Sequence, residues 1–443
     1  MTRSDGPTAA SSSRPRAEPA ESCLIGPPRG NYVEEVDPGN RYPGRGRQAR
    51  RPAAAPRRPR ALEVALVVGD DDAGRLARDL CWLERFTPAT ARAAAALPRL
   101  DGERILVVCH LDVKMIPYFR GLMDAGAEVW ACAANPATTR DAVAANLAEL
   151  GVRCGARAGD PPARHAGRLR DALAAAPTLL SEMGADATVA GGGRIPSVRG
   201  GLEATGTGVK RLAGVDLAYP VFDWDGVPVK QGLHNRHLVG LMGMATFLAV
   251  TGLSLYGKRV LVVGYGPVGR GIADAARSFG AVVGVCDPAP AARLAASHLG
   301  YLVQPLDEGL AQAEVVFTAT GRDQGLTLAE LAGCPDGVFL ANLGHSNREL
   351  PVAELREHLV ETPRDGVEVC RVGGRARYLL AGGAMLNLAA GPGDPYDTFD
   401  LVTALLLEAT GFLALEGHRW PAGVHPLPAA VADRAASRVL GVA

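Results

Sequence analysis

The sequence lacks several features that would assign it to a specialised class. Its 47 basic and 47 acidic residues cancel, so no charge excess points to nucleic acid or an anionic membrane as the main partner. None of its 8 cysteines forms a Cys-x-x-Cys pair, which argues against a metal site and suits a reducing compartment. No apolar run approaches the length of a membrane span, and the N-terminus lacks a secretory layout. We therefore expect a cytoplasmic protein.

The length and the composition divide the chain into a tail and two domains. A chain of 443 residues exceeds the size at which one core usually stops growing, and its 47% hydrophobic content supports sizeable cores. Residues 1–60 are rich in Arg, Pro, Ser, Gly and Ala, with a basic cluster over 41–60. Such a segment buries too little apolar area to offset chain entropy, so we expect it to be disordered.

Strand and helix patterns alternate through the rest of the chain. We expect strands at 61–68, 104–109, 127–132, 260–263, 281–285, 315–318 and 338–341. We expect helices at 73–83, 116–125, 141–150, 237–250, 271–279 and 399–415. The pattern predicts an α/β protein with two doubly wound parallel-sheet domains. The first comprises residues 61–235 and 386–443. The second, over 236–385, is a Rossmann domain that binds NAD.

The Rossmann prediction depends on a glycine-rich turn. Residues 263–271 read VGYGPVGRG, after a strand and at the start of a helix. Gly264 permits the tight turn, Gly266 lets the backbone approach a pyrophosphate, and Gly269 allows close helix–strand contact. Asp287 follows about 20 residues later, at the end of the next strand, where an acid accepts hydrogen bonds from a ribose 2′-hydroxyl. This arrangement favours NAD over NADP.

The residues around this turn resemble adenosylhomocysteinase. The family pattern is Gly-Tyr-Gly-x-Val-Gly-Lys-Gly, with Arg270 here in place of the lysine. Further similar blocks follow in order: CHL at 109–111, TGTGV at 205–209, NLGH at 342–345, MLNL at 385–388 and WPAGVHPLP at 420–428. The resemblance runs from about residue 75 to the end of the chain.

The resemblance implies a reaction and a set of residues. In the family, bound NAD⁺ oxidises the ribose 3′-hydroxyl of adenosylhomocysteine, a base removes the C4′ proton, the 5′ thiolate leaves, water adds and the ketone is reduced again. Lys230 matches the lysine at the ribose hydroxyls. His234 follows it as a second acid–base group. His110 matches the histidine near the leaving group, and His345 a second active-site histidine.

The resemblance also implies a substrate-binding and a cofactor-binding set. The substrate set consists of Asp112, Met183, Ala204, Lys230 and His234. The cofactor set consists of Thr205, Gly206, Thr207, Asn235, Gly264, Gly266, Pro267, Val268, Gly269, Arg270, Asp287, Thr318, Leu343, Gly344, His345, Asn387 and Asp394. We expect a small-molecule nucleoside substrate and a homo-oligomer, with neither a membrane nor a nucleic acid as partner.

The departures from the family gather at the substrate end. The family's Lys-x-x-Phe-Asp-Asn is KQGLHN at 230–235, so its aspartate is His234. Its Gly-His-Pro is GDP at 393–395, so its histidine is Asp394. Its adenine-side Thr and Glu are Asp112 and Lys114, and two sugar-side acids are Met183 and Ala204.

These departures leave alternatives open. The chain is predicted to act on adenosylhomocysteine or a related nucleoside, with thioether hydrolysis or with only the redox part, giving a keto or epimerised product. A second hypothesis is that the chain is a non-catalytic NAD-binding paralogue with a regulatory role. A 2-hydroxyacid dehydrogenase shares the fold, but we can assign no arginine for a substrate carboxylate beside the catalytic histidine.

Overall fold

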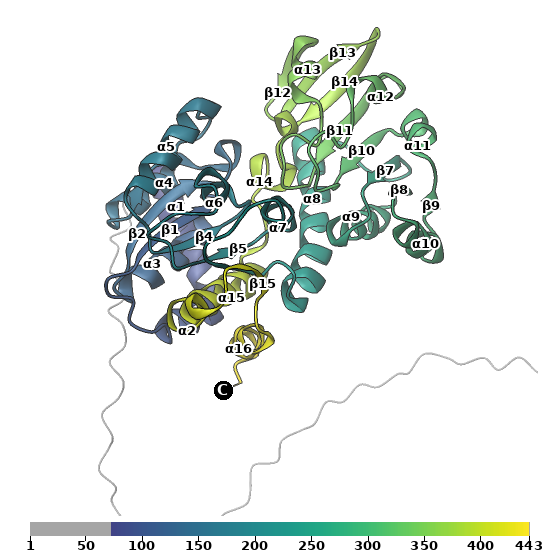
Figure 1. The fold of residues 1–443 in the computed structure, drawn as a ribbon. Helices are drawn as coiled ribbons and strands as arrows, with labels where there is room; N and C mark the ends of the chain where they lie inside the picture. The colour runs from purple at the N-terminus through teal and green to yellow at the C-terminus, as the bar shows by residue number, and fades with distance from the viewer. Residues whose placement is uncertain (1–71, 443) are drawn as a thin grey trace, which may run out of the picture. The chain divides into compact units, whose positions relative to one another are not determined.

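The computed structural model describes residues 72–442. The tail predicted over 1–60 and the strand predicted over 61–68 lie outside the described residues. Two mostly parallel sheets with helices on both faces make up the described chain (Figure 1). The predicted α/β fold class is confirmed.

The first sheet has seven parallel strands in the order β15-β6-β5-β4-β1-β2-β3. The strands are β1 (Arg104–Cys109), β2 (Glu128–Ala133), β3 (Arg153–Cys154), β4 (Leu179–Glu182), β5 (Gly200–Glu203), β6 (Pro220–Asp223) and β15 (Gly423–Pro426). The strand order reverses between β1 and β4, which pair side by side. A reversal of this kind opens a crevice at the carboxyl ends of the two strands.

Helices cover this sheet. They are α1 (Asp72–Phe86), α2 (Pro88–Ala95), α3 (Ile116–Asp124), α4 (Asp141–Glu149), α5 (Pro162–Ala174), α6 (Asp186–Ala190), α7 (Gly206–Leu212), α15 (Tyr396–Leu415) and α16 (Ala429–Leu440). Helix α15 packs into the core cluster that β1 of this sheet also joins. The carboxylate of Asp400 in α15 accepts hydrogen bonds from the backbone N–H groups of Ala89 (2.9 Å) and Thr90 (2.6 Å) at the start of α2. These N–H groups have no partner within their own helix, so the contact joins distant parts of the chain.

Helix α15 is long and apolar enough to span a membrane by length and composition, and 72% of its most apolar window is buried inside the protein. Its leucines, among them Leu405 and Leu407, belong to the same core cluster as Ile105 and Val107 of β1. Packing against the first sheet therefore accounts for its apolar composition.

The second sheet has eight strands in the order β12-β13-β14-β11-β10-β7-β8-β9. The strands are β7 (Arg259–Val263), β8 (Val282–Cys286), β9 (Leu302–Val303), β10 (Val315–Thr318), β11 (Val338–Asn342), β12 (Leu359–Arg364), β13 (Val367–Val372) and β14 (Arg375–Leu380). From β9 to β14 the pairs are parallel, in the order typical of a Rossmann sheet, with the reversal between β7 and β10. The antiparallel strands β12 and β13 extend it, and the sequence patterns did not predict them.

The helices that accompany the second sheet are α8 (Val239–Thr251), α9 (Pro267–Ser278), α10 (Pro290–His298), α11 (Leu306–Gln312), α12 (Leu328–Ala332), α13 (Val352–Glu357) and α14 (Leu386–Ala389). Helix α8 continues from a π-helix at Lys230–Leu238, where the sequence patterns predicted an ordinary helix from 237. The π-helix lies directly against α9: a Cβ placed on Gly271 would lie 2.1 Å from the carbonyl oxygen of Arg236. Only a glycine fits at this crossing.

Candidate functional site

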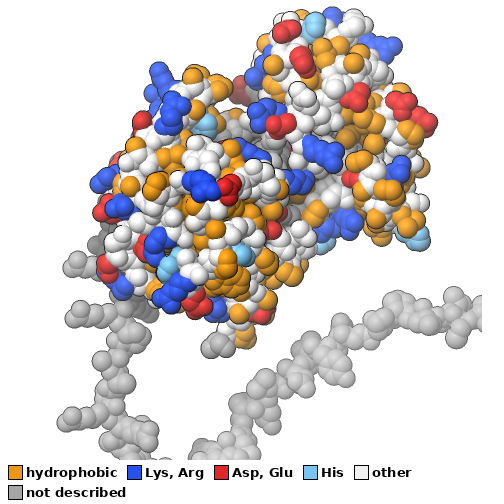
Figure 2. Space-filling model, viewed as in Figure 1, with side chains coloured by type: hydrophobic (Ala, Val, Ile, Leu, Met, Phe, Trp, Pro, Cys, Tyr) orange, Lys and Arg blue, Asp and Glu red, His pale blue; other side chains and the backbone are white. Residues whose placement is uncertain are grey.

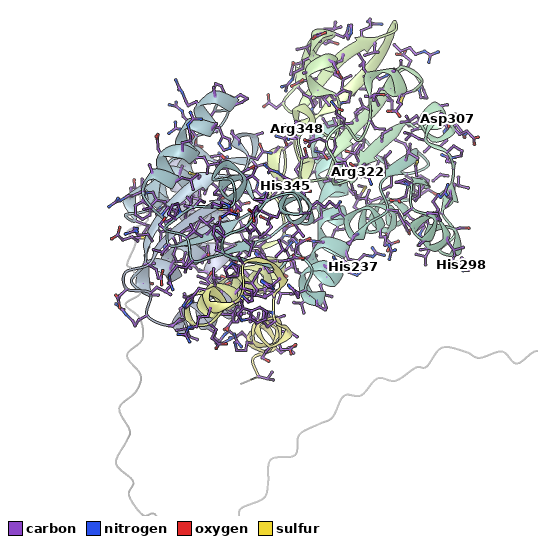
Figure 3. All side chains as sticks on the ribbon, in the orientation of Figure 1. His237, His298, Asp307, Arg322, His345 and Arg348 are labelled. Carbon is purple, nitrogen blue, oxygen red and sulfur yellow. The ribbon has the colours of Figure 1, made fainter. Side chains whose placement is uncertain are left out.

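A cavity of about 930 Å³ lies at the carboxyl ends of strands from both sheets. Its walls include His110 after β1, Met183 after β4, Gly264 after β7 and Leu343 after β11. Figure 3 labels two further lining residues, His345 and, on the side of the second sheet, Arg322, whereas His298 lies at the far end of α10. Charged side chains of both signs are interspersed over the visible face of the protein, in keeping with its zero net charge (Figure 2).

The cavity brings together most of the predicted site residues. Those that line it are His110, Asp112, Met183, Ala204, Thr205, Gly206, Thr207, Lys230, His234, Asn235, Gly264, Gly266, Pro267, Val268, Asp287, Leu343, Gly344, His345, Asn387 and Asp394. Residues that are 284 positions apart in the sequence, His110 and Asp394, therefore share one cavity.

Three residues predicted at the cofactor do not line this cavity. Gly269 lies beneath the turn, where a Cβ would come 1.9 Å from the carbonyl oxygen of Gly264. The Arg270 guanidinium lies over the ring of Tyr265, 5.5 Å from its centroid. Thr318 is fully buried at the end of β10. Gly269 and Thr318 are buried, whereas Arg270 is exposed.

The glycine-rich turn has the form of a dinucleotide cradle. Gly264 has a φ of +96°, and a Cβ there would lie 2.5 Å from the carbonyl oxygen of Ala319 on the neighbouring strand end. By contrast, a Cβ on Gly266 would meet nothing within 4 Å, so the protein leaves open space above this backbone. The Asp287 carboxylate is held at the edge of the turn by the backbone N–H of Tyr265 (2.7 Å) and that of Ala289 (2.8 Å).

The residues of the turn fit NAD. Helix α9 starts at Pro267, directly after the turn, and offers its free N–H groups to a pyrophosphate. The fixed Asp287 carboxylate has lone pairs left for ribose hydroxyls. Farther along the cavity, the buried side-chain oxygens Oδ1 of Asn387 and Oδ1 of Asp394 have no hydrogen-bond partner among the described residues. Buried polar atoms without partners are rare, and both residues line the cavity.

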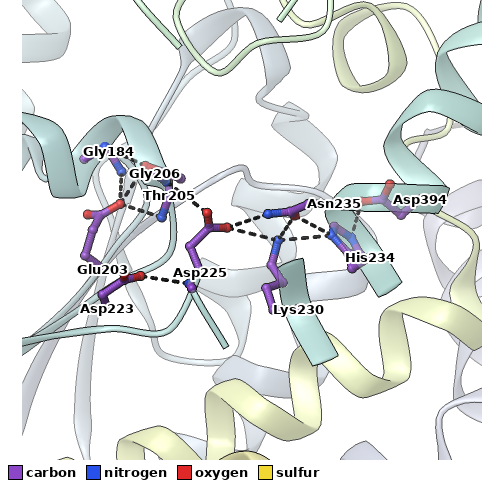
Figure 4. Close-up of polar contacts among 12 residues, drawn as sticks. Gly184, Glu203, Thr205, Gly206, Asp223, Asp225, Lys230, His234, Asn235 and Asp394 are labelled. Carbon is purple, nitrogen blue, oxygen red and sulfur yellow. Dashed lines mark hydrogen bonds and ion pairs between the residues drawn. The ribbon is translucent and has the colours of Figure 1, made fainter. Parts of the chain in front are cut away.

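A chain of polar contacts joins residues that line the cavity (Figure 4). Lys230 Nζ lies 3.0 Å from His234 Nδ1 and donates to Asn235 Oδ1 at 2.6 Å. On one side, Asn235 Nδ2 donates to Asp225 Oδ1 at 2.8 Å. On the other side, His234 Nε2 lies 3.0 Å from Asp394 Oδ2. The chain therefore places an amine and an imidazole between two carboxylates.

The π-helix explains this convergence. Its hydrogen bonds span five residues, so side chains four and five positions apart lie over one another. Lys230, His234 and Asn235 have this spacing, and all three are buried. The sequence spacing alone, read as an ordinary helix or a loop, does not bring Lys230 and Asn235 together.

Burial controls the ionisation of this chain. Burial lowers the pKa of the Lys230 ammonium from its usual 10.5, although the nearby Asp225 and Asp394 carboxylates oppose the shift. Burial alone would raise the pKa of Asp394, but the charge and hydrogen bond of His234, with Lys114 and Lys230 nearby, lower it to about 2. Asp394 is therefore a carboxylate at neutral pH, and Lys230 loses its proton more readily than an ordinary lysine.

Two histidines face each other at another part of the cavity wall. The ring centroids of His110 and His345 are 5.5 Å apart. Burial, together with the neighbouring His345, lowers the pKa of His110 to about 3, and burial also lowers the pKa of His345. His110 Nδ1 lies 2.7 Å from Thr138 Oγ1, which itself donates to the carbonyl oxygen of Asn135. Nδ1 of His110 is therefore the protonated nitrogen, and Nε2 is left as an acceptor.

The substrate end contains a charge pair that the sequence patterns did not predict. Lys114 Nζ donates to Asp112 Oδ2 at 2.5 Å and to the carbonyl oxygen of Pro392 at 2.9 Å. Both side chains are nearly buried, and both line the cavity. Sequence comparison had marked each of the two as a departure, but their spacing of two residues gave no sign that they form a pair.

The acids nearest to Met183 and Ala204 in sequence point away from the cavity. Glu182 accepts a hydrogen bond from the backbone N–H of Ala187 at 2.6 Å, and Glu203 accepts one from that of Gly184 at 2.9 Å. Neither glutamate lines the cavity, whereas Met183 and Ala204 do. The carboxylate that does line this region is Asp225, which sequence reasoning missed because it lies outside the aligned blocks.

Glu203 supplies a prediction about stability. Burial and the neighbouring Glu182 raise the pKa of Glu203 from 4.5 to about 8. Because the folded-state value is the higher one, the stabilisation from this group is fully present below pH 4.5 and is lost as the pH rises through about 8. We expect thermal denaturation of the native chain to shift by at least about 2 °C to lower temperature between pH 6 and pH 9.

The Glu203→Gln variant, which resembles the protonated acid, should lose most of this shift. Exposed Glu357 on α13 provides the matched control, and Glu357→Gln should show the same pH-dependent shift of thermal denaturation as the native chain. Equal pH dependence in both variants would show that Glu203 does not carry the effect.

Comparison with known proteins places the chain beside one group of enzymes. Residues 245–393 match the family model described as S-adenosyl-L-homocysteine hydrolase, NAD binding domain. The chain is 34% identical over 349 residues to S-inosyl-L-homocysteine hydrolase of Methanopyrus kandleri, covering 76% of this chain and 82% of the relative. It is 34% identical to adenosylhomocysteinase of Thermococcus kodakarensis, covering 78% and 86%. It is 33% identical to adenosylhomocysteinase of Thermotoga maritima, covering 80% and 91%.

Proposed function

This chain belongs to the S-adenosyl-L-homocysteine hydrolase family, and from that premise we propose that it oxidises the 3′-hydroxyl of a homocysteine-linked nucleoside and releases homocysteine. Its cofactor is NAD. The observation that carries the proposal is the position of the Lys230–His234 pair, which lines the same cavity as the glycine-rich turn. An acid–base pair in the same cavity as an NAD-binding turn is what oxidation of a secondary alcohol requires.

In this proposal Lys230 is the first proton acceptor. The chemistry that bound NAD⁺ would supply is acceptance of a hydride from the sugar and its later return. The hydroxyl proton has to leave at the same time, and a buried amine with a lowered pKa can take it. His234, 3.0 Å from Lys230 Nζ, can receive a proton from the amine in turn. Lys230 Nζ donates to Asn235 Oδ1 at 2.6 Å, and Asp225 holds Asn235 through a second hydrogen bond at 2.8 Å while forming an ion pair with the amine at 3.7 Å.

The histidine pair suits the elimination step. Oxidation at C3′ acidifies the C4′ proton, and the 5′ thiolate can then leave. Neutral His110 presents Nε2 as an acceptor, as its contact with Thr138 requires, and His345 lies 5.5 Å away between ring centroids. We assign these two side chains to proton transfer at C4′ and at the departing sulfur. Because their pKa values are lowered, both imidazoles are unprotonated at neutral pH.

Two substrates follow from the names of the relatives, the adenosyl and the inosyl thioether. The pair of Asp112 and Lys114 favours the inosyl thioether. Two N–H groups of Lys114 have hydrogen-bond acceptors, and the third has none among residues 72–442, although the amine also lies over the rings of Tyr396 and Phe399 at 5.8 and 5.6 Å. A 6-oxopurine presents a carbonyl acceptor beside an N1–H donor, which complements an ammonium beside a carboxylate. Adenine presents a donor at position 6 and an acceptor at N1, in the opposite order.

The experiment that tests the proposed function uses the purified full-length chain with NAD⁺. Each thioether is supplied in turn, homocysteine is followed with a thiol reagent, and the reduced cofactor is followed at 340 nm. The proposal requires thiol release that depends on NAD⁺. Cofactor reduction without thiol release would leave only a redox or epimerase activity. NAD⁺ binding with neither signal would identify a non-catalytic, regulatory paralogue.

The base preference gives a separate prediction. We expect kcat/KM for the inosyl thioether to exceed that for the adenosyl thioether by at least about tenfold, the worth of one well-placed charged hydrogen bond. Lys114→Gln should reduce this ratio toward one, while Arg140→Gln, on the exposed side of the same region, should leave it unchanged. A ratio below one in the native chain would assign the substrate to the adenosyl class.

Location and assembly remain predictions. The described cysteines are free thiols, as expected in a reducing cytoplasm. We also propose a homo-oligomer, which light scattering of the full-length chain would test.

A further inference from the structure

Two of the departures from the family pattern touch each other. His234 stands where the pattern has an aspartate, and Asp394 stands where it has a histidine. The two are 160 positions apart, yet His234 Nε2 lies 3.0 Å from Asp394 Oδ2 (Figure 4). Both side chains are only 7% exposed. Taken singly, each change removes a functional group, but together they exchange an acid and an imidazole across one contact.

The contact determines which nitrogen of His234 is free. A carboxylate only accepts hydrogen bonds, so Nε2 must carry the proton that is shared with Asp394. In the neutral imidazole the other ring nitrogen, Nδ1, then has a lone pair. This nitrogen lies 3.0 Å from Lys230 Nζ and 3.1 Å from Asn235 Oδ1, an oxygen that already accepts a hydrogen bond from the same amine at 2.6 Å. In this orientation, Nδ1 can take a proton from Lys230. With the opposite tautomer, Lys230 would face an N–H group and no transfer could occur.

The surroundings of the pair support a fixed geometry. The ring of Phe399 from α15 lies against His234 with centroids 6.1 Å apart. The charged groups near Asp394 are Lys114, Lys230 and His234, and Asp225 lies beyond Lys230. The second oxygen of Asp394, Oδ1, is buried without a partner among the described residues. No other acid among those groups lies within hydrogen-bond distance of His234 in the described part of the chain.

We infer that Asp394 is a positioning residue that holds His234 in the Nε2–H tautomer, so that the pair acts as one proton relay behind Lys230. This inference rests on the proposed function. The proton from the sugar hydroxyl passes to the Lys230 amine, and a proton of the resulting ammonium passes to His234 Nδ1. The imidazolium that forms is stabilised by the Asp394 carboxylate. No electron moves in this relay, and the return of the hydride reverses each transfer.

The kinetic test compares single replacements with a reciprocal exchange. His234→Asp alone places two carboxylates against each other, and Asp394→His alone places two imidazoles there. Each should reduce kcat for nucleoside-dependent NAD⁺ reduction by at least about 100-fold. The double variant H234D/D394H restores an acid–imidazole pair. Its kcat should be at least about tenfold higher than that of the slower single variant. Thermal denaturation and NAD⁺ binding are measured for every variant to confirm folding.

A milder replacement separates positioning from structure. Asp394→Asn keeps the size and one acceptor but lets His234 adopt either tautomer, so kcat should fall about 100-fold with KM within threefold. Asp397→Asn, an exposed acid three residues away, is the matched control and should match the native chain. A native kcat in Asp394→Asn would overturn the inference. So would a double variant whose loss of kcat is as large as the product of the losses in the two single variants.

A readout independent of turnover distinguishes this inference from the proposed function. In ¹⁵N-histidine-labelled protein at pH 8.5, the native His234 should show a protonated Nε2 and an unprotonated Nδ1, and Asp394→Asn should show a mixture. A mixture in the native chain overturns the inference even if the enzyme is active. Conversely, a single tautomer in a chain that never reduces NAD⁺ supports the positioning role of Asp394 while the proposed function fails.

Discussion

Replacing Lys230 with methionine is expected to lower the rate of nucleoside-dependent NAD⁺ reduction by about 10³-fold, within the range for loss of a general base. The side chain is buried at the centre of the polar chain, with His234, Asn235 and Asp225 around its amine. Methionine keeps the length and the apolar stem but removes the amine, which lies 5.8 Å from the centroid of the Trp224 ring and is the group that accepts the proton. The measurement is single-turnover absorbance at 340 nm with saturating cofactor.

Arginine at the same position tests whether the proton, rather than the charge, matters. Lys230→Arg keeps the positive charge beside Asp225 but cannot act as a base at accessible pH, so it should be as slow as the methionine variant. In the native chain the rate should rise with pH as Lys230 loses its proton, with a midpoint below the ordinary lysine value of 10.5. Gln231→Ala, an exposed neighbour, should keep this profile. An arginine variant with more than a tenth of the native rate would remove Lys230 from the role of base.

The second large effect is expected at the cofactor. Gly266→Ala should weaken NAD⁺ binding by about 100-fold, equivalent to roughly 2.7 kcal/mol, without changing the melting temperature of the free protein. A Cβ at this position meets no protein atom within 4 Å, so the fold tolerates it. The same methyl group would occupy the space in which the backbone approaches the pyrophosphate. Isothermal titration calorimetry and thermal denaturation measure the two quantities.

Two other glycines provide the comparison. Gly214→Ala adds a methyl group at an exposed turn with nothing within 4 Å and should change neither binding nor stability. Gly269→Ala would place a Cβ 1.9 Å from the carbonyl oxygen of Gly264, and should destabilise the protein itself. If Gly266→Ala binds NAD⁺ with native affinity, the cofactor does not pass over this turn.

The long, apolar elements of the fold were predictable from sequence. The strands β1 and β10 have the predicted bounds, because continuous runs of β-branched and apolar residues are buried on both faces of a parallel sheet. Helix α4 ends beside Gly151, as predicted, since glycine readily adopts the positive φ that follows a helix.

Short strands were not predictable. Strand β5 reads Gly-Gly-Leu-Glu, a composition that disfavours a strand, and β3 has only two residues. They form because a neighbouring strand supplies hydrogen-bond partners: β5 pairs with β4 on one side and with β6 on the other. Such pairing joins residues distant in sequence and leaves little local signal.

The sequence by itself determined the cofactor half of this protein. One local segment contains a strand, three spaced glycines, the start of a helix and the following Asp287. Its local geometry is sufficient to predict a dinucleotide-binding turn. The tertiary structure alone decided the substrate half. The π-helix turned Lys230, His234 and Asn235 to one side, and the return of the chain after β14 brought Asp394 within 3.0 Å of His234. A contact between residues 160 positions apart depends on how the elements pack, so two changes that the sequence presents as separate losses form one acid–imidazole pair in the folded chain.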